Sequence, residues 1–339
     1  MSVQYDLPDP PTDAISAVKF APKSSRMLVS SWDKFVYLYD TAPPSGQLLS
    51  KFEHRAPVLD VCFGENENVA YTAGVDHACR RIDLTTSDQK LLSTHAAGVR
   101  SVAYSPSHNI LISASWDCTL HVHRLTDTSQ EPLKIMLPNK PFSLSTTATK
   151  LVVAMSARTV HIYELSSLAA NDKPEPWQRR ESSLKFMTRA VSCMPTDLGY
   201  ASGSIEGRVA VEWFDPSTES QARKYAFKCH RLNPPEGDEG GDIVYPVNAL
   251  AFHPTHGTFA SGGGDGIVAL WDGLAKRRIR QYQRYSSSVA ALGFSGDGKY
   301  LAIATCPGFE DGKEAVGEGE IKIHIRGLAD GEAKGKGAK

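Results

Sequence analysis

The chain has 339 residues, a hydrophobic content of 41% and a formal net charge of −1. The hydrophobic content is enough for a folded core, and the near-zero charge gives no overall attraction to nucleic acid or to an anionic membrane. Six cysteines are present and none are spaced as CxxC, which argues against a zinc or redox motif and favours a reducing intracellular compartment. The sequence opens without a signal-peptide pattern, and no apolar run approaches the roughly 20 residues that a membrane span needs.

A repeated pattern of two apolar residues and an aromatic residue organises the chain. It starts at Ile15, Val58, Val99, Val247 and Val289. Neighbouring starts lie 43, 41 and 42 residues apart (15 to 58, 58 to 99 and 247 to 289). This spacing matches the period of about 40–45 residues that is typical of WD repeats.

Each start is followed by a second apolar segment that ends in a Ser/Gly/Asp-rich turn, and then by a third strand. The second segments with their turns lie at 26–33, 69–76, 110–117, 199–206 and 258–265. The third strands lie at 35–40, 78–83, 119–124, 209–215 and 267–272. Two weaker copies, at 142–165 and 289–325, bring the total to seven, or to six if the 142–165 copy is irregular.

Short strands of this kind cannot bury both of their faces alone, but they can when they stack radially as four-stranded sheets. The sequence therefore predicts an all-β fold, a seven-bladed WD-repeat β-propeller that spans residues 1–328. The last copy lacks a fourth strand, and VQYDL at 3–7 is expected to supply it and so close the ring. Residues 329–339 contain no apolar residue larger than alanine, which predicts a disordered basic tail.

Two histidines and two aspartates recur at equivalent positions of the repeat. His54 and His95 each lie four residues before an apolar start, and Asp76 and Asp117 lie in the matching turns. WD repeats use such a pair for hydrogen bonds inside a blade, often with a tryptophan such as Trp271. We expect this structural role rather than catalysis, and we expect no enzyme activity, cofactor or metal site.

Two loops rich in glycine and acidic residues interrupt the repeats, at 231–245 and 307–320. Both are predicted to be mobile loops on the surface.

Two tryptophans stand out at a position that the repeat usually fills with a small or polar residue. Trp32 and Trp116 each lie in an SWD triplet, just before the turn between the second and third strands. These turns lie on one face of a propeller, which we call the upper face. Two indoles on one face indicate a protein-binding surface; packing of each ring on a neighbouring loop is the alternative.

Three cations of the fifth repeat are predicted to converge on the same face. Arg189 begins the first strand, Arg208 follows the upper turn and Lys228 ends the fourth strand. Such a group suits a carboxylate or a phosphate. The alternative is solvated surface charge, or an ion pair with Glu206 or Glu212.

Several segments of the chain resemble one family of WD-repeat proteins. The most specific are RRESSLKFMTR at 179–189, SIEGRVAVEWFDP at 204–216 and YAFKCHRLN at 225–233. They resemble the spindle-checkpoint family named after budding uninhibited by benzimidazoles (Bub three), and the likeness runs from Ile15 to about Ile325. The related Rae family of messenger-RNA export factors shares the EGRVA and FKCHR segments.

The resemblance implies ligands that the residues alone do not name. It implies that Trp32, Trp116 and Arg189 bind the GLEBS motif of checkpoint kinases and of their Mad-type or pseudokinase relatives. It implies that Arg208 and Lys228 bind the phosphothreonine of MELT repeats in a kinetochore scaffold. The implied protein is a monomeric adaptor of the nucleus and cytoplasm that moves to kinetochores in mitosis and needs neither membrane nor nucleic acid. A Rae-like adaptor for nucleoporins and RNA is the alternative.

Overall fold

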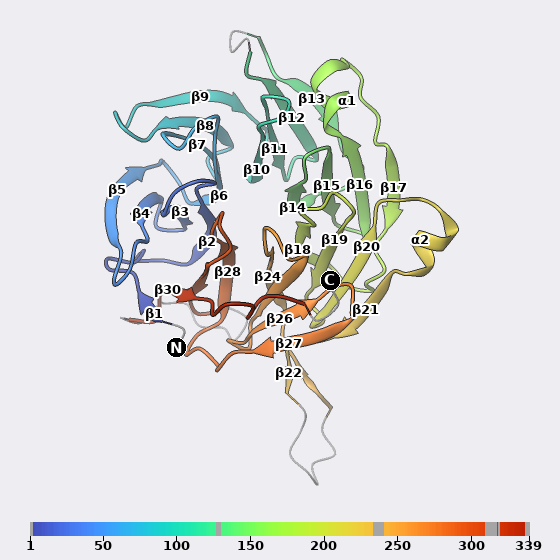
Figure 1. Cartoon of the computed structure of the whole chain (residues 1–339). Coiled ribbons are helices and arrows are strands. Elements are labelled where there is room, and N and C mark those ends of the chain that lie inside the picture. The colour runs from blue at the N-terminus through green and yellow to red at the C-terminus, as the bar shows by residue number, and fades with distance from the viewer. Residues whose placement is uncertain (1–2, 127–129, 233–240, 309–316, 318, 336–339) are drawn as a thin grey trace.

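The computed structural model describes residues 3–126, 130–232, 241–308, 317 and 319–335. Its strands form seven four-stranded antiparallel sheets around a central axis, together with a two-stranded hairpin (Figure 1). The predicted seven-bladed propeller is confirmed, and the weak copy at 142–165 forms a regular blade. The described chain also contains two short helices, α1 (Leu165–Ala170) and α2 (Thr218–Ala222).

The blades follow one another in chain order, and each uses four successive strands except the last. The strands of blades one to three are β2 (Ile15–Phe20), β3 (Arg26–Ser31), β4 (Phe35–Asp40), β5 (Gln47–Glu53), β6 (Val58–Phe63), β7 (Val69–Gly74), β8 (Ala78–Asp83), β9 (Gln89–Thr94), β10 (Val99–Ser105), β11 (Ile110–Ser115), β12 (Thr119–Arg124) and β13 (Leu133–Met136). The strands of blades four and five are β14 (Pro141–Thr146), β15 (Lys150–Met155), β16 (Thr159–Glu164), β17 (Gln178–Glu181), β18 (Thr188–Cys193), β19 (Gly199–Ser204), β20 (Arg208–Trp213) and β21 (Tyr225–Lys228). The strands of blades six and seven are β24 (Val247–Phe252), β25 (Thr258–Gly263), β26 (Val268–Asp272), β27 (Arg277–Gln281), β28 (Val289–Phe294), β29 (Tyr300–Thr305), β30 (Lys322–Gly327) and β1 (Gln4–Asp6).

The position of a strand within its blade sets its burial. Every residue of the second strands β7 and β11 is buried, because a sheet neighbour flanks each edge and an adjacent blade covers each face. The outer strands β17 and β21 instead alternate between half-buried and exposed residues. The core therefore lies between neighbouring blades, and the fourth strands form the outer rim.

The N-terminal strand closes the ring, as the sequence predicts. β1 pairs antiparallel with β30 and completes blade seven, with Tyr5 opposite Ile325. The Leu7 amide extends the pairing by donating to the Ile323 carbonyl at 2.9 Å. His324 Nδ1 lies 2.6 Å from Asp6 Oδ1 and adds a side-chain contact across the same two strands.

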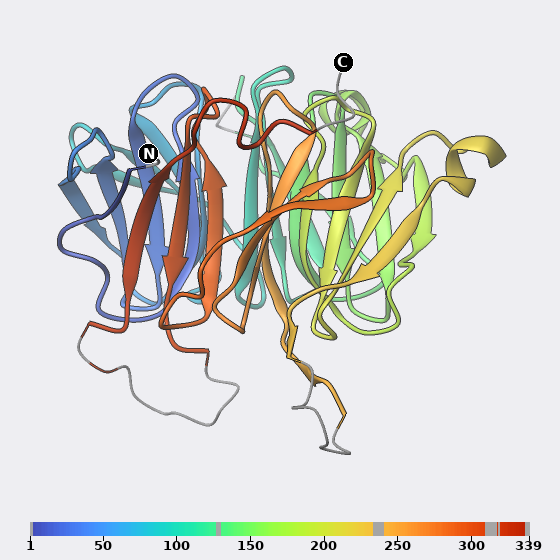
Figure 2. The ribbon, with the colours of Figure 1, turned by 60° about the horizontal axis from the view of Figure 1, so that its bottom comes forward.

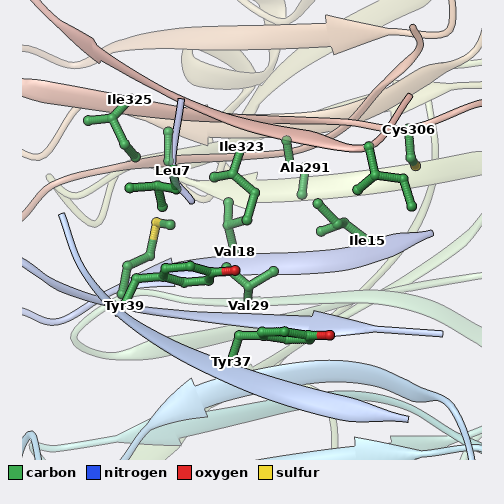
Figure 3. Close-up of a cluster of buried hydrophobic side chains, with 14 of the residues drawn as sticks. Leu7, Ile15, Val18, Val29, Tyr37, Tyr39, Ala291, Cys306, Ile323 and Ile325 are labelled. Carbon is green, nitrogen blue, oxygen red and sulfur yellow. The ribbon is translucent and has the colours of Figure 1, made fainter. Parts of the chain in front are cut away.

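A buried apolar cluster joins blade seven to blade one at this closure. Figure 3 shows side chains of the two blades interleaved between the sheets. Its fully buried members come from several strands and include Val29, Tyr39, Ile323 and Ile325. Since burial of one large apolar side chain stabilises a fold by about 1.5–3 kcal/mol, the cluster is a major contribution to ring closure.

The C-terminal segment corrects one expectation. Residues 329–335, predicted to begin a disordered tail, pack on the face opposite the upper turns. Ala333 is buried, and its carbonyl accepts a hydrogen bond from the Thr258 hydroxyl at 2.6 Å. Glu332 reaches the Tyr282 hydroxyl at 2.8 Å. The segment is held because Ala333 and the Glu332 carboxylate find partners on blades six and seven, which composition alone does not reveal.

The two predicted loops lie partly outside the described residues. The ends of the first form the hairpin β22 (Arg231–Leu232) and β23 (Ile243–Val244), which extends beyond the blades (Figure 2). Residues 233–240 of the first loop lie outside the described residues, as do 309–316 and 318 of the second and 336–339 at the C-terminus.

Blade six contains a complete polar network of the kind expected for a WD repeat. His230 Nδ1 lies 2.9 Å from Asp265 Oδ1, and its Nε2 lies 2.8 Å from the Ser261 hydroxyl. Trp271 Nε1 donates to the same hydroxyl at 2.8 Å. A side chain at Gly263 would stand 2.2 Å from His230 Nδ1, so this position must remain glycine. His230, which the sequence analysis did not single out, is therefore the histidine of this network.

The networks of blades two and three differ from the expected histidine–aspartate pair. In blade three, His95 Nε2 lies 2.9 Å from the Ser113 hydroxyl and its Nδ1 is 3.6 Å from Asp117. In blade two, His54 contacts the Thr72 hydroxyl at 3.0 Å, while Asp76 pairs with Arg80 at 2.6 Å. The expected His54–Asp76 bond is replaced because a cation four residues along the chain takes the carboxylate.

The blade-six network generates a stability prediction. Asp265→Ala leaves the buried His230 ring without its carboxylate partner, which should lower the free energy of unfolding by about 1–3 kcal/mol. Urea unfolding followed by tryptophan fluorescence measures the change. The matched control is Asp330→Ala at an exposed position, expected to change stability by less than about 0.5 kcal/mol. Equal stability of the two variants would contradict a structural role for the network.

Buried neutral histidines generate a pH prediction. Burial lowers the pKa of His54 to about 4, whereas the unfolded chain protonates near its ordinary value of about 6.5. Unfolding therefore binds protons as the pH falls below about 6.5, and the stability from neutral His54 is lost progressively towards pH 4. Between pH 7 and 5 the loss attributable to His54 is about 2 kcal/mol.

The check is the difference in unfolding free energy between pH 7 and pH 5. His54→Gln should show a smaller difference than the parent chain. The control is His77→Asn, an exposed histidine with a φ of 67°, which asparagine tolerates; it should keep the parental pH dependence. An unchanged dependence in His54→Gln would refute the assignment.

Candidate protein-binding face

One backbone hydrogen bond recurs on the upper face of every blade. In each, the amide just after the second strand donates to the carbonyl just before the first strand, at 2.8–3.1 Å. The donors are Trp32, Val75, Trp116, Ser156, Ile205, Gly264 and Cys306. This bond holds the two connections of a blade together, and it places the seven donor residues at equivalent points around the axis.

Three of these seven equivalent positions carry large apolar side chains. Trp32 is 44% exposed and Ile205 is 37% exposed, while Trp116 is half-buried. Trp116 lies close over Gly98, where an added Cβ would stand 3.0 Å from the indole. Trp32 therefore presents its indole to solvent, whereas Trp116 packs partly on the neighbouring loop. Ile205 is a third apolar member of this face that the sequence analysis did not single out.

A β-bulge also recurs, at the second residue of each first strand. The strand register shifts there in all seven blades, so one extra residue is inserted in each. The inserted residues are Ser16, Leu59, Arg100, Phe142, Arg189, Asn248 and Ala290. Bulges re-aim side chains, and six of these seven residues line one cavity at the mouth of the central channel.

This cavity brings together the three residues predicted to form one binding site. Its volume is about 830 Å³, and Trp32, Trp116 and Arg189 all line it. They come from blades one, three and five, so the ring itself assembles them. Arg100 and Asn248 complete the polar lining.

The cavity contains two guanidinium groups that affect each other. Burial lowers the pKa of Arg100 first, the Asp60 carboxylate opposes that shift, and the positive charge of Arg189 lowers it further. The Asp60 carboxylate already accepts two hydrogen bonds, from the backbone amides of Val61 at 3.0 Å and Val102 at 3.1 Å. An anionic group in the cavity would relieve the repulsion between the two arginines. Arg100 was not among the candidate site residues predicted from the sequence, although it occupies the same repeat position as Arg189.

The other predicted cations lie further out on blade five. Arg208 of β20 and Lys228 of β21 are direct cross-strand partners at the upper end of the blade. Arg208 Nε is 3.5 Å from a Glu206 oxygen, so that alternative ion pair is present. Arg231 also lies here and donates to the Glu206 carbonyl at 2.8 Å. The upper face therefore has two cationic regions near blade five. Arg189 lies in the cavity, and Arg208, Lys228 and Arg231 lie further out, in a region that we call the rim of blade five.

The second alternative partner, Glu212, does not reach this cluster. Glu212 is buried, accepts the Tyr200 hydroxyl at 3.1 Å and lies 3.8 Å from Arg180. It therefore pairs with neither Arg208 nor Lys228, and Glu206 is the carboxylate beside Arg208.

Comparison with known proteins identifies the family. The model of the WD domain, G-beta repeat, matches residues 2–40, 86–124 and 242–272. The mitotic checkpoint protein BUB3.1 of Arabidopsis thaliana is 43% identical over 99% of this chain and 96% of its own length. The chain belongs to the Bub3 family.

Other relatives of this Bub3-family chain extend the comparison. The mitotic checkpoint protein bub3 of Dictyostelium discoideum is 37% identical over 94% of each chain. The poly(A)+ RNA export protein of Schizosaccharomyces pombe is 30% identical over 88% of this chain and 83% of its own length. Both of these matches cover most of the propeller.

Among the described residues, no group of three or more histidine, cysteine or acidic side chains is arranged to hold a metal ion. Within the same residues, no helix has the length and apolar character required to cross a membrane.

Proposed function

We propose that this Bub3-family chain is an adaptor of the mitotic spindle checkpoint that holds two protein segments on its upper face. The relatives named as mitotic checkpoint proteins support the pathway. The observation that carries the molecular proposal is the separation of two cationic regions on one face, one inside an indole-lined cavity and one at the rim of blade five.

The cavity is the proposed site for the GLEBS motif of checkpoint kinases and of their Mad-type or pseudokinase relatives. An extended segment that crosses the channel mouth would pack an apolar side chain on Trp32 and Trp116. Its acidic side chains would pair with Arg189, and Arg100 adds positive charge at the same place. Exposed indoles suit this role because they bury a large area and lose little side-chain entropy.

The rim of blade five is the proposed site for a phosphothreonine of a MELT repeat in a kinetochore scaffold. A threonine hydroxyl offers little to Arg208 and Lys228. A phosphate carries a charge of about −1.5 to −2 and three strong acceptors, so it forms one to three charge-assisted hydrogen bonds. Such a group would compete with Glu206 for Arg208, because the phosphate has the larger charge.

Together the two sites would make recruitment of a GLEBS-bound partner depend on phosphorylation of the kinetochore scaffold. The propeller would carry its GLEBS-bound partner through the nucleus and cytoplasm and deliver it to a phosphorylated kinetochore in mitosis. The role is binding without catalysis, and it needs no cofactor.

Arg208→Ala tests the phosphate site. Loss of one charged hydrogen-bonding group should weaken binding of a phosphorylated MELT peptide by about 10- to 100-fold and leave binding of a GLEBS peptide unchanged. Calorimetry with both peptides measures this. The control Lys224→Ala removes an exposed cation of the same blade and should change neither affinity. Equal affinity of the parent chain for phosphorylated and unmodified peptide would defeat the proposal.

Trp32→Ala tests the cavity. Removal of a central indole should weaken the GLEBS peptide by about 30-fold or more and leave the phosphopeptide unaffected. The chain offers a matched control in Trp177, which is 40% exposed and packs beneath Lys150 away from the cavity. Trp177→Ala should bind both peptides normally. A comparable loss in both variants would show that the effect is not specific to this face.

The RNA-export relative supports a second candidate, a Rae-like adaptor for nucleoporins and RNA. Salt-dependent binding of single-stranded RNA without phosphopeptide binding would favour it over the checkpoint role.

A further inference from the structure

We propose that the groove between the outer edges of blades six and seven binds an acidic, extended peptide segment that adds to the free edge of β27. This site lies on the side of the propeller and is separate from both sites on the upper face.

The groove is built from strongly basic side chains. It has a volume of about 370 Å³, and the polar side chains that line it are Gln4, Arg280, Gln281, Gln283, Arg284 and Arg326. One wall is β27 with the segment that follows it, and the other is formed by β1 and β30 of blade seven. Three guanidinium groups and three side-chain amides thus face one narrow space, which suits carboxylates and peptide groups.

The outer strand β27 carries more positive charge than any other outer strand. β27 carries three arginines, whereas none of the other six outer strands carries more than two cations. Residues 276–284 contain five cations and no acidic residue. Charged side chains commonly protect sheet edges from aggregation, but that purpose would apply equally to all seven blades. The excess on β27 therefore requires another explanation.

The chain itself shows which chemistry these arginines accept. The Glu332 carboxylate lies 3.1 Å from Arg280 and 3.7 Å from Arg326, and it accepts the Tyr282 hydroxyl at 2.8 Å. One carboxylate is therefore already bound beside the groove. Within the described part of the chain, two arginines form no ion pair and remain available for further acidic groups: Arg284, which lines the groove, and Arg277, which begins β27 outside that lining.

The edge also offers backbone pairing. β27 is the last strand of its sheet, so one of its sides has no strand partner. A peptide that adds as a fifth strand would gain main-chain hydrogen bonds and place alternate side chains against the arginines. We favour a peptide over RNA because the chain as a whole has a net charge of −1, and the basic residues form one narrow strip along a sheet edge.

The test is fluorescence anisotropy with a short labelled peptide of alternating glutamate and threonine, at low and physiological salt. The parent chain should bind it, and Arg277→Glu/Arg284→Glu should bind at least tenfold more weakly. Neither residue contacts Glu332, so the variant should keep the parental melting temperature. The matched control Lys51→Glu/Lys90→Glu makes the same change of charge on the outer strands β5 and β9 and should bind normally.

Two further probes separate the alternatives. A peptide of the same charge with proline in place of threonine cannot pair along an edge and should bind at least tenfold more weakly than the threonine peptide. Equal binding of the proline peptide, or equal loss in both charge variants, would overturn strand addition at this groove. Tight binding of single-stranded RNA that depends on Arg277 and Arg284, without peptide binding, would overturn the choice of a peptide.

Discussion

The pairing of β1 with β30 is the interaction on which the rest of the structure depends. Six blades are continuous in the chain, but the seventh exists only because the first strand of the protein completes it. The buried apolar cluster at this seam, which includes Val29, Ile323 and Ile325, joins the two ends of the ring. A closed ring fixes the seven blades relative to one another, and so fixes side chains that lie far apart in sequence.

Two small repeated features convert that ring into a binding face. The backbone hydrogen bond on the upper face places one residue per blade around the axis, and the bulges in the first strands bring residues of six blades to the channel mouth. Neither feature dictates a side chain, so each blade is free to vary these positions. Trp32 and Arg189 occupy one position of each kind, and the cavity contains both. The proposed binding residues thus occupy positions that the fold presents but does not need.

Much of this was predictable from the sequence, because the repeat period fixes the number of blades and the position of each turn. The closing strand at 3–7, the solvent-exposed indole of Trp32 and the cross-strand neighbours Arg208 and Lys228 follow from that register. The remaining features depend on contacts between residues distant in sequence. Arg80 takes Asp76 away from His54, and Ala333 with Glu332 holds a segment whose composition indicates disorder. Arg100 could have been found, since it aligns with Arg189, but its proximity to that residue required the bulges.

We propose that one rigid face holds two different protein segments at once. The most direct test of this proposal is a titration of phosphorylated MELT peptide into the chain already saturated with GLEBS peptide. We expect one phosphopeptide to bind per chain without displacing the GLEBS peptide, since the cavity and the rim of blade five use different side chains. Displacement of either peptide by the other would contradict simultaneous binding.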